Sequence, residues 1–258
     1  MSTPGPNIHP NAKIGKGTVV EPFATIYDDV IIGENCWIGP NVVIFPASRI
    51  GNNVKIFPGA IIGPDSQDLK YAGEYTTTEV GDNTVIREYV TIHRGTKDKM
   101  KTVVGSNCLL MAYVHVAHDC IVGNHVIIAN SVGLSGHVTV DDYAIIEGMA
   151  AVQQFIHIGA HSFIGGGTMV RKNVPPFVKA AREPISFIGV NSVGLRRRGF
   201  SDAQIALIED IYRVIYVQNS NVSSALKIVE FELPASPEKD QIVDFIKAST
   251  KGIMRGIS

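Results

Sequence analysis

The hydrophobic pattern of this chain repeats every six residues. From Ile8 to Ile62 every sixth residue is Ile or Val, and the same frame returns from Val80 to Ile92 and from Val104 to Val170. In total 25 aliphatic positions keep this frame, and a small or β-branched residue follows each of them by four places. A period of six fits neither an amphipathic helix, with its period of about 3.6, nor the simple alternation of an ordinary strand.

Such a period predicts a hexapeptide repeat, in which each hexad forms one short strand and one turn. Three hexads close a triangular coil, so residues 18 apart in the sequence lie one above the other in neighbouring coils. The aliphatic residue points into the prism and the small residue fits near a corner, with coils about 4.8 Å apart. The predicted fold class is an all-β parallel β-helix followed by a small α-helical domain.

Two segments interrupt the repeat and a third ends it. The segments "QDLKYAGEYTTT" (67–78) and "KDKMKT" (97–102) lack the frame, and we expect them to be loops inserted into the prism. The period is lost after "VPP" at 174–176. We therefore assign residues 1–188 to the β-helix domain and residues 189–258 to the helical domain.

The C-terminal domain carries helical patterns. Ser201 and Gln204 form a capping-box pair ahead of apolar residues at helical spacing. Two more amphipathic helices are predicted at 221–232 and 237–249, the second with Ser236 as its N-cap. We expect these helices to cover the open end of the prism, as the capping segments of repeat proteins do.

Composition and charge narrow the class of protein. The formal net charge is −1 and 18 % of the residues are charged, which favours a packed globular protein and gives no reason to expect a nucleic-acid partner. No apolar run approaches the ~18 residues that span a bilayer, and the N-terminus lacks a secretion signal, so we expect a cytoplasmic protein without membrane insertion. The three cysteines are expected to be buried thiols: Cys36, Cys108 and Cys120.

The stacking of coils brings polar residues from distant hexads together. The segment "YVHVAHDC" (113–120) carries two histidines and an aspartate at or next to a turn. Moving by one coil of 18 residues, with 97–102 looped out, places further histidines, a glycine and a glutamine on the same outer face. The predicted patch consists of His93, His115, His118, Asp119, Gly136, His137 and Gln154.

Three interpretations of this patch compete. Histidines at turns can simply be solvated, although four of them on adjacent coils beside an aspartate make that explanation weak. A zinc site from His93, His115 and His118 would leave one coordination position open. In general-base catalysis, a histidine oriented by a carboxylate removes a proton from an attacking hydroxyl, and a glycine N–H stabilises the resulting oxyanion.

Several motifs make the chain resemble the UDP-N-acetylglucosamine O-acyltransferases over nearly its whole length. They are "QDLKYAGE" (67–74), "TIHRGT" (91–96), "HVAHDC" (115–120), "LSGH" (134–137), "QQF" (153–155), "VPPFV" (174–178) and "GVNSVGLRRRGF" (189–200). The resemblance implies a left-handed coil, a homotrimer with active sites between subunits, and no cofactor. It also implies transfer of a 3-hydroxyacyl chain from acyl carrier protein to the 3-hydroxyl of UDP-N-acetylglucosamine, the first step of lipid A synthesis.

The same resemblance assigns roles to individual residues. It makes His118 the general base and Asp119 its support, and it assigns the Gly136 N–H to the tetrahedral oxyanion. Residues that match positions holding the nucleotide sugar or shaping the cleft are Asp68, Lys70, His93, His115, His137 and Gln154. Residues that match positions approaching the diphosphate from a neighbouring subunit are Asn191, Arg197 and Arg198.

The chain departs from the family pattern at two positions. Gln153 stands where members commonly have His, and Val193 stands where they have Glu. A glutamine keeps its hydrogen-bonding capacity but cannot ionise, and a valine removes an acceptor. The sequence therefore leaves open whether the acceptor is the N-acetylglucosamine nucleotide or its 3-amino analogue.

The donor side is predicted from charge and from glycines. Between Met169 and Phe200 the local balance is +6, which suits docking of an acidic carrier protein, although it can also be a solvated basic face. The predicted docking residues are Arg171, Lys172, Lys179, Arg182 and Arg196. The family resemblance implies an acyl groove whose length is limited by side-chain bulk near its end, and it places Gly166 and Gly167 there, where they would leave room for a long chain.

Two alternatives to this function stay open at the level of the sequence. One is an acetyl-CoA-dependent acetyltransferase built on the same prism. The other, from a different class, is a non-catalytic metal-binding trimer.

Overall fold

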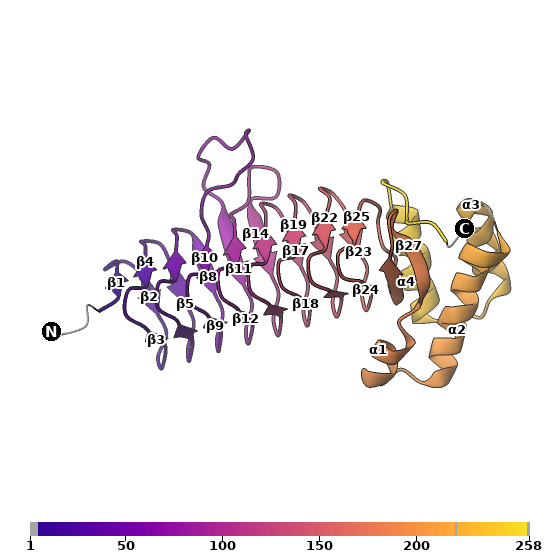
Figure 1. The fold of residues 1–258 in the computed structure, drawn as a ribbon, viewed down its shortest axis with the longest axis horizontal. Coiled ribbons are helices and arrows are strands. Elements are labelled where there is room, and N and C mark those ends of the chain that lie inside the picture. Colours follow the sequence, from indigo (N-terminus) through magenta and orange to yellow (C-terminus); the bar gives the residue numbers. More distant parts are fainter. Residues whose placement is uncertain (1–4, 220, 257–258) are drawn as a thin grey trace.

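The computed structural model describes residues 5–219 and 221–256, and it is an elongated prism closed at one end by helices (Figure 1). Short strands run in three parallel sheets along the prism. The first sheet contains β1 (Asn7–Ile8), β4 (Thr25–Ile26), β7 (Val43–Ile44), β10 (Ile61–Ile62), β13 (Thr91–Ile92), β16 (His115–Val116), β19 (Gly133–Leu134), β22 (Ala151–Val152) and β25 (Met169–Val170).

The other two sheets are built in the same way. The second contains β2 (Lys13–Ile14), β5 (Ile31–Ile32), β8 (Ser48–Ile50), β11 (Thr77–Val80), β14 (Lys101–Val104), β17 (Ile121–Val122), β20 (Thr139–Val140) and β23 (His157–Ile158). The third contains β3 (Val19–Val20), β6 (Trp37–Ile38), β9 (Lys55–Ile56), β12 (Val85–Ile86), β15 (Leu109–Leu110), β18 (Ile127–Ile128), β21 (Ile145–Ile146), β24 (Phe163–Ile164), β26 (Val178–Ala181) and β27 (Ser186–Val190).

The register of the strands confirms the predicted coil. In most pairs the partners are 18 residues apart, as with His115 and Gly133. Ile92 pairs with Val116 although 24 residues separate them, so the chain after β13 does loop out of the prism as the frame required. The two loops end at residues 76 and 100, because the last two residues of each predicted insertion lengthen strands β11 and β14.

The inward aliphatic positions form one continuous core. All of them from Ile26 to Val170 are buried, whereas Ile8 is 37 % exposed because the first coil has no coil beneath it. The three cysteines are buried free thiols, as predicted. The corners turn through residues in the left-handed region of backbone conformation, many of them asparagine, the non-glycine residue that tolerates this region best (Asn35, Asn41, Asn53, Asn83 and Asn107).

The end of the prism is more elaborate than the sequence predicted. After the repeat is lost, β26 extends the third sheet in parallel and β27 pairs with β26 in antiparallel orientation. Strand β27 runs across the predicted domain boundary at residue 188. Helix α1 (Ser192–Arg197), which follows it, was likewise not predicted.

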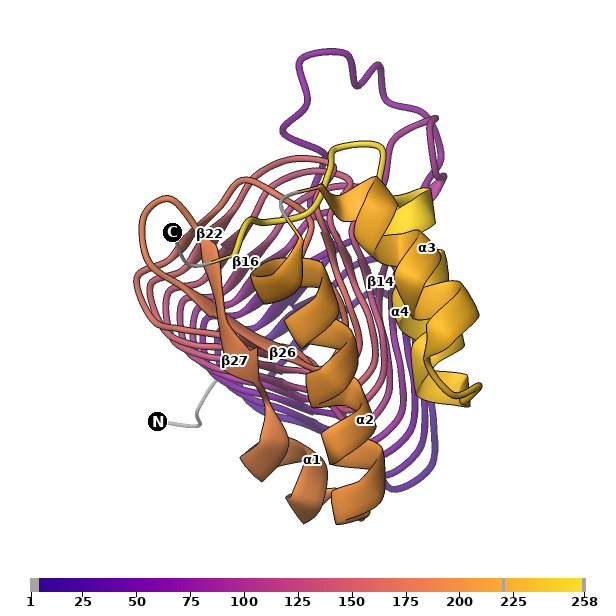
Figure 2. The same cartoon turned by 90° about the vertical axis from the view of Figure 1, so that its right-hand side faces the viewer.

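The remaining helices lie across the triangular end of the prism (Figure 2). They are α2 (Asp202–Arg213), a π-helical turn η1 (Val214–Gln218), α3 (Val222–Glu232) and α4 (Pro237–Ala248). The predicted capping box at Ser201 and the N-cap at Ser236 are both present. The hydroxyl of the fully buried Tyr212 on α2 donates to the carbonyl oxygen of Pro176 at 2.6 Å and so ties the helices to the last coil.

Truncating an inward aliphatic residue is expected to destabilise the whole prism. Ile128 is completely buried, so Ile128→Ala should lower the free energy of unfolding by about 2–5 kcal/mol through lost burial and an unfilled cavity. The matched control Val19→Ala removes a side chain that is 52 % exposed and should cost less than about 1 kcal/mol. Equilibrium denaturant unfolding measures both, and equal losses would contradict the assignment of the inward frame.

None of the helices in the described residues has both the length and the apolar character needed to cross a bilayer.

Candidate active site

Both inserted loops and the histidine patch occupy one edge of the prism. The chain passes from the first sheet to the second at this edge, which we call the first corner; the second corner follows the second sheet and the third corner follows the third. The two loops project from the first corner (Figure 1). His118, Gly136 and Gln154 follow strands β16, β19 and β22 at the same corner, one coil apart.

His118 and Asp119 form a hydrogen-bonded dyad. The His118 Nδ1 lies 2.8 Å from Asp119 Oδ2, and the two side chains are 9 % and 0 % exposed. Since an ionised carboxylate can only accept, the imidazole donates from Nδ1, which leaves the Nε2 lone pair free. This arrangement fixes the tautomer that a general base requires.

The Asp119 carboxylate is held by the second loop as well as by the histidine. Oδ1 accepts from the backbone N–H of Thr96 at 2.9 Å and of Lys99 at 3.2 Å, and Oδ2 accepts from the Thr96 hydroxyl at 2.7 Å. Burial by itself raises the pKa of Asp119, but the hydrogen bonds from His118, Thr96 and Lys99 outweigh it and hold the pKa below its ordinary value. The carboxylate is therefore ionised at neutral pH in spite of its burial.

Gly136 lies directly above the imidazole, as the coil spacing predicted. A Cβ placed on Gly136 would come within 2.5 Å of His118 Cε1 and Nε2, so no side chain fits there. Among the described residues the Gly136 N–H has no hydrogen-bond partner, although its carbonyl oxygen accepts from the Phe155 N–H. That amide can be offered to a ligand beside His118 Nε2.

His137 completes the inner part of the patch. Its ring meets the His118 ring edge to face at 5.0 Å and stacks on Phe155 at 4.6 Å. Its Nδ1 lies 3.1 Å from an Asp98 oxygen without the alignment of a hydrogen bond, and its Nε2 lies 3.7 Å from Asp119 Oδ2. Burial lowers the pKa of His137, so the ring is neutral at neutral pH.

His93 and His115 lie beside this group. His115 belongs to the same coil as His118, and His93 belongs to the coil below it. Their ring centroids are 5.2 Å apart, His93 Nδ1 is 2.7 Å from the Asp65 carbonyl oxygen, and His115 Nδ1 is 2.8 Å from the Thr91 hydroxyl. Burial lowers the pKa of both histidines. Each ring thus already has a partner for one of its nitrogens.

A cavity of about 280 Å³ opens between the two loops and the prism. Its lining residues are Asp68, Lys70, Glu74, Thr96, Lys97, Asp98, His137 and Phe155. Asp68 and Lys70 thus lie where the sequence placed them, with Asp68 Oδ2 at 4.0 Å from His118 Nε2. Glu74 joins the two loops, because its carboxylate accepts from the Ala72 N–H at 2.8 Å and the Lys97 N–H at 2.9 Å.

Of the predicted substrate-binding residues, His93, His115 and Gln154 lie at or beside the first corner without lining this cavity, and three others lie away from that corner on the same chain. Asn191 is buried and donates from its amide to the His161 carbonyl oxygen at 2.9 Å, and Arg198 lies 5.4 Å from the centre of the Tyr143 ring. His161 and Tyr143 belong to the second corner, and the exposed Arg197 ends helix α1 nearby. Burial, with the charge of Arg198, lowers the pKa of His161 to about 4.

The predicted carrier-docking residues are partly neutralised by acids. Arg171 pairs with Glu183, and Arg196 pairs with Asp202, which lies just outside the segment whose charge was counted. Lys172 donates to the Lys251 carbonyl oxygen at 3.0 Å. The two others, Lys179 and Arg182, lie on and directly after β26 at the helical end of the prism.

Gly166 and Gly167 turn the third corner after β24, away from His118 on its own chain. Gly167 has a φ of +69° and nothing near the position of a Cβ, whereas a Cβ on Gly166 would lie 3.3 Å from the Gly148 carbonyl oxygen. On one chain, the width of the first sheet separates these glycines from the corner that carries the dyad.

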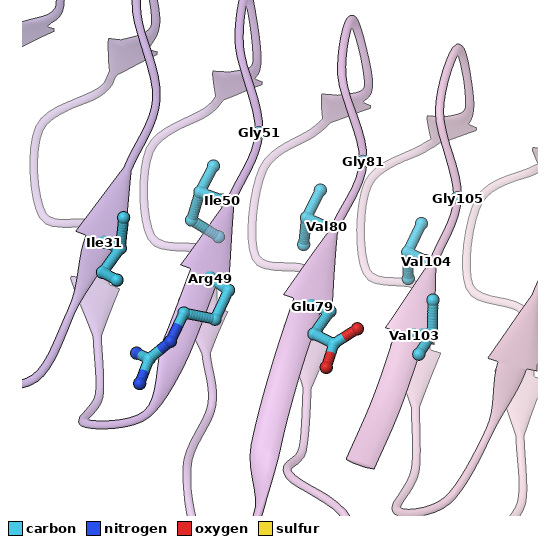
Figure 3. A pocket seen from close by; sticks show the side chains of 10 residues that line it. All are labelled: Ile31, Arg49, Ile50, Gly51, Glu79, Val80, Gly81, Val103, Val104 and Gly105. Carbon is cyan, nitrogen blue, oxygen red and sulfur yellow. The ribbon is translucent and has the colours of Figure 1, made fainter. Parts of the chain in front are cut away.

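A separate depression of about 380 Å³ lies on the second sheet (Figure 3). The half-buried Arg49 and Glu79 project from its strands, and Arg49 pairs with Asp29 at 2.7 Å. Its lining includes no histidine, so it does not compete with the first corner as a site of chemistry.

Sequence reasoning missed five residues that line the cavity: Glu74, Thr96, Lys97, Asp98 and Phe155. Phe155 could have been found, because it stands 18 residues after His137 and must therefore stack on it. Glu74, Lys97 and Asp98 lie in the loops, where the six-residue frame gives no positions. Thr96 fills the small corner position four residues after Ile92, which predicts its burial but not its bonds to Asp119.

Known families match both parts of the chain. A profile described as the second domain of Udp N-acetylglucosamine O-acyltransferase matches residues 173–254, and one described as bacterial transferase hexapeptide (six repeats) matches residues 11–46 and 101–136.

Two curated relatives carry one name, acyl-[acyl-carrier-protein]–UDP-N-acetylglucosamine O-acyltransferase. The relative from Pseudomonas putida is 44 % identical over 249 residues, 96 % of each chain. The relative from Pseudomonas syringae pv. tomato is 46 % identical over 194 residues, 75 % of each chain.

Solved structures agree with the curated relatives. A UDP-N-acetylglucosamine acyltransferase from Bacteroides fragilis superposes with a TM-score of 0.96 at 50 % identity, covering 99 % of this chain and all of that one. The corresponding Acinetobacter baumannii enzyme gives 0.94 at 38 % identity, covering 99 % of both chains. These matches confirm the left-handed β-helix. The chain belongs to the UDP-N-acetylglucosamine O-acyltransferase family.

Proposed function

We propose that this chain transfers a 3-hydroxyacyl group from acyl carrier protein to the 3-hydroxyl of UDP-N-acetylglucosamine, the first step of lipid A synthesis, with His118 as the general base. Membership of the family supports the reaction. The observation that carries the mechanism is the buried dyad, in which Asp119 orients His118 and leaves Nε2 free at the edge of a cavity.

The proton and the acyl group move in opposite directions. Nε2 of His118 removes the proton of the sugar 3-hydroxyl as its oxygen attacks the thioester carbonyl carbon, and the carbonyl oxygen becomes an oxyanion beside the Gly136 N–H. When the tetrahedral intermediate collapses, the C–S bond breaks and the imidazolium returns its proton to the leaving thiolate. The products are the acylated nucleotide sugar and the free thiol of the carrier, and no cofactor is consumed.

The proposed active enzyme is a homotrimer, and the positions of the remaining site residues support this assembly. Arg198 at the second corner and Gly166 at the third cannot reach His118 at the first corner of the same chain, but neighbouring prisms placed side by side would bring different corners together. Exposed apolar side chains also project from the third corner, with Tyr89 at 55 %, Tyr113 at 60 % and Met149 at 74 % exposure. Exposed apolar clusters of this kind mark protein contacts.

The remaining binding roles form part of the same proposal. Asp68, Lys70, His93, His115, His137 and Gln154 shape the pocket for the nucleotide sugar on one subunit. Asn191, Arg197 and Arg198 of its neighbour approach the diphosphate, to which arginine offers two parallel N–H groups. Of the predicted docking residues, Lys172, Lys179 and Arg182 have no acidic partner among the described residues and keep their charges for the carrier protein, since acids pair with Arg171 and Arg196. The cytoplasm, where carrier and nucleotide sugar occur together, stays the predicted location.

The test is a transfer assay with mass analysis of the products. The pure protein is incubated with UDP-N-acetylglucosamine or its 3-amino analogue, and with 3-hydroxyacyl carriers of increasing length or acetyl-CoA. We expect an ester on the N-acetylglucosamine nucleotide from long-chain carriers, because glycines end the groove. Transfer from acetyl-CoA alone would refute acyl carrier protein as the donor. Transfer only from chains of about ten carbons or fewer would refute the assignment of Gly166 and Gly167 to the end of the acyl groove.

Thr96 is expected to act as a positioning residue for the dyad. Thr96→Val deletes the hydroxyl that donates to Asp119 and keeps the shape, so we expect kcat to fall by about tenfold while KM for the nucleotide sugar stays within about twofold. Thr96→Ser restores the donor and should restore kcat. A purely structural role for Thr96 would instead lower thermal stability without separating kcat from KM.

A further inference from the structure

Three side chains at the first corner present metal-ligating atoms to one another. In the described part of the chain, Asp68, His118 and His137 are the one group of histidine, cysteine or acidic residues whose ligand atoms all lie within 4.8 Å. The His93–His115–His118 site that the sequence offered for zinc is not such a group. Two imidazoles and one carboxylate are a common ligand set for zinc with an open fourth position.

The support around His118 is the one that a metal-bound histidine usually has. Histidine ligands typically donate their second ring N–H to a carboxylate, which fixes the ring and raises the basicity of the ligating nitrogen. Here the Asp119 carboxylate accepts the hydrogen bond from His118 Nδ1 at 2.8 Å, and the free Nε2 lies 4.0 Å from Asp68 Oδ2. The dyad that prepares a general base therefore also prepares a metal ligand.

His137 offers the second nitrogen. Its side chain is 9 % exposed, its Nδ1 is buried without a hydrogen-bond partner among the described residues, and its ring is neutral at neutral pH. The acidic Asp98 stands 3.1 Å from this ring and adds negative charge beside the group. A buried, neutral imidazole with an unsatisfied nitrogen is ready to bind a cation.

We propose that Asp68, His118 and His137 form an inhibitory site for Zn²⁺ and similar divalent transition metals. Zinc holds its ligands about 2.0–2.2 Å away in a tetrahedron, so the ligand atoms have to approach to about 3.3 Å from one another. The Asp68 carboxylate and the His137 ring close that gap by side-chain rotation. Water or the substrate hydroxyl takes the fourth position.

Inhibition follows because metal and substrate compete for one lone pair. This part rests on the proposed function, in which His118 Nε2 receives the proton of the sugar hydroxyl. A metal ion on Nε2 removes the base, and it also occupies the cavity floor between Asp68 and His137. Zinc inhibition should therefore be competitive with the nucleotide sugar and reversed by EDTA.

Cobalt(II) tests the site without reference to catalysis. Titration of the full-length protein with Co²⁺ should give one visible ligand-field band per chain, at the intensity of four- or five-coordinate cobalt, and Zn²⁺ should displace it. Asp68→Asn and His137→Asn should each weaken Co²⁺ binding by at least about tenfold. Asparagine suits position 137 because this chain already uses it at corner positions with positive φ, as His137 has.

The matched control is His9→Ala, which removes an exposed histidine at the same corner far down the prism and should leave the spectrum unchanged. Circular dichroism and thermal melting check that each variant is folded. A Co²⁺ affinity unchanged in the Asp68→Asn/His137→Asn double variant, or the absence of a visible band in the unsubstituted protein, would overturn the site.

The two proposals can fail separately. A cobalt spectrum from a protein that does not acylate UDP-N-acetylglucosamine would keep the metal site and refute the proposed reaction. An active enzyme that zinc does not inhibit would refute the metal proposal and keep the reaction.

Discussion

The variant His118→Ala is expected to lower kcat for acyl transfer by about 10²–10⁴-fold, the usual contribution of a general base. The loss should fall on kcat rather than on the KM of the nucleotide sugar, since the imidazole acts on the proton that moves in the transition state. Initial rates with a long-chain acyl carrier measure both constants. The remaining activity would come from the Gly136 N–H and from substrate positioning.

The control for His118→Ala is His9→Ala, which should retain full activity. His9→Ala should melt at the unsubstituted temperature because His9 is exposed, and His118→Ala should stay folded because Asp119 keeps its hydrogen bonds from Thr96 and Lys99. A His118→Ala enzyme within about threefold of the unsubstituted kcat would exclude this histidine as the base.

The second large effect is expected from a single methyl group. Gly136→Ala places a Cβ 2.5 Å from His118 Cε1 and Nε2, closer than two carbon or nitrogen atoms can approach, so the ring must move. A displacement of about 1 Å at the reacting group can cost about 10²-fold in rate, and we expect kcat to fall by at least that much. The backbone at Gly136 lies outside the positive-φ region, so alanine adds no backbone strain.

The same coil offers the control. Gly133 also lies outside the positive-φ region, and a Cβ there would meet nothing within 4 Å, so Gly133→Ala should be active and stable. Steady-state kinetics on the pair separates the effect of the added methyl group from that of losing a glycine. Comparable activity in the two variants would show that the Gly136–His118 contact has no part in catalysis.

The sequence predicted the prism well because each hexad repeats one physical requirement, an aliphatic side chain that fills the inside of the prism. Every inward position from Ile26 to Val170 is buried, and the 18-residue register by itself places Gly136 above His118. Specific motifs then led to the correct family. The relative positions of site residues were thus predictable where those residues occupy corresponding positions in neighbouring coils, as His118 and Gly136 do.

The rest depended on contacts that no repeat specifies. Thr96 fills a corner position of the frame, but its bond to Asp119 depends on how the chain turns into the second loop, and Asp98 reaches His137 from within that loop. At the helical end of the prism, β26 pairs with β24 of the last coil, and β27 pairs with β26. Strand formation there depends on pairing with the existing sheet, which the six-residue pattern does not predict. The helical spacing through Ile215 likewise gave no sign that the end of α2 widens into a π-helical turn.

The even stacking of the coils has a consequence for how such a molecule can change. Each coil adds about 4.8 Å of height, so a cleft that runs lengthwise between two prisms can be extended or shortened only in increments of that size. One coil inserted between the dyad and Gly166 would admit roughly four more methylene groups, leaving the chemistry at Nε2 untouched. Smaller changes in the accepted chain length must come from the size of side chains that line the cleft. Chain-length specificity can therefore change in large increments through the number of coils and in small increments through single substitutions.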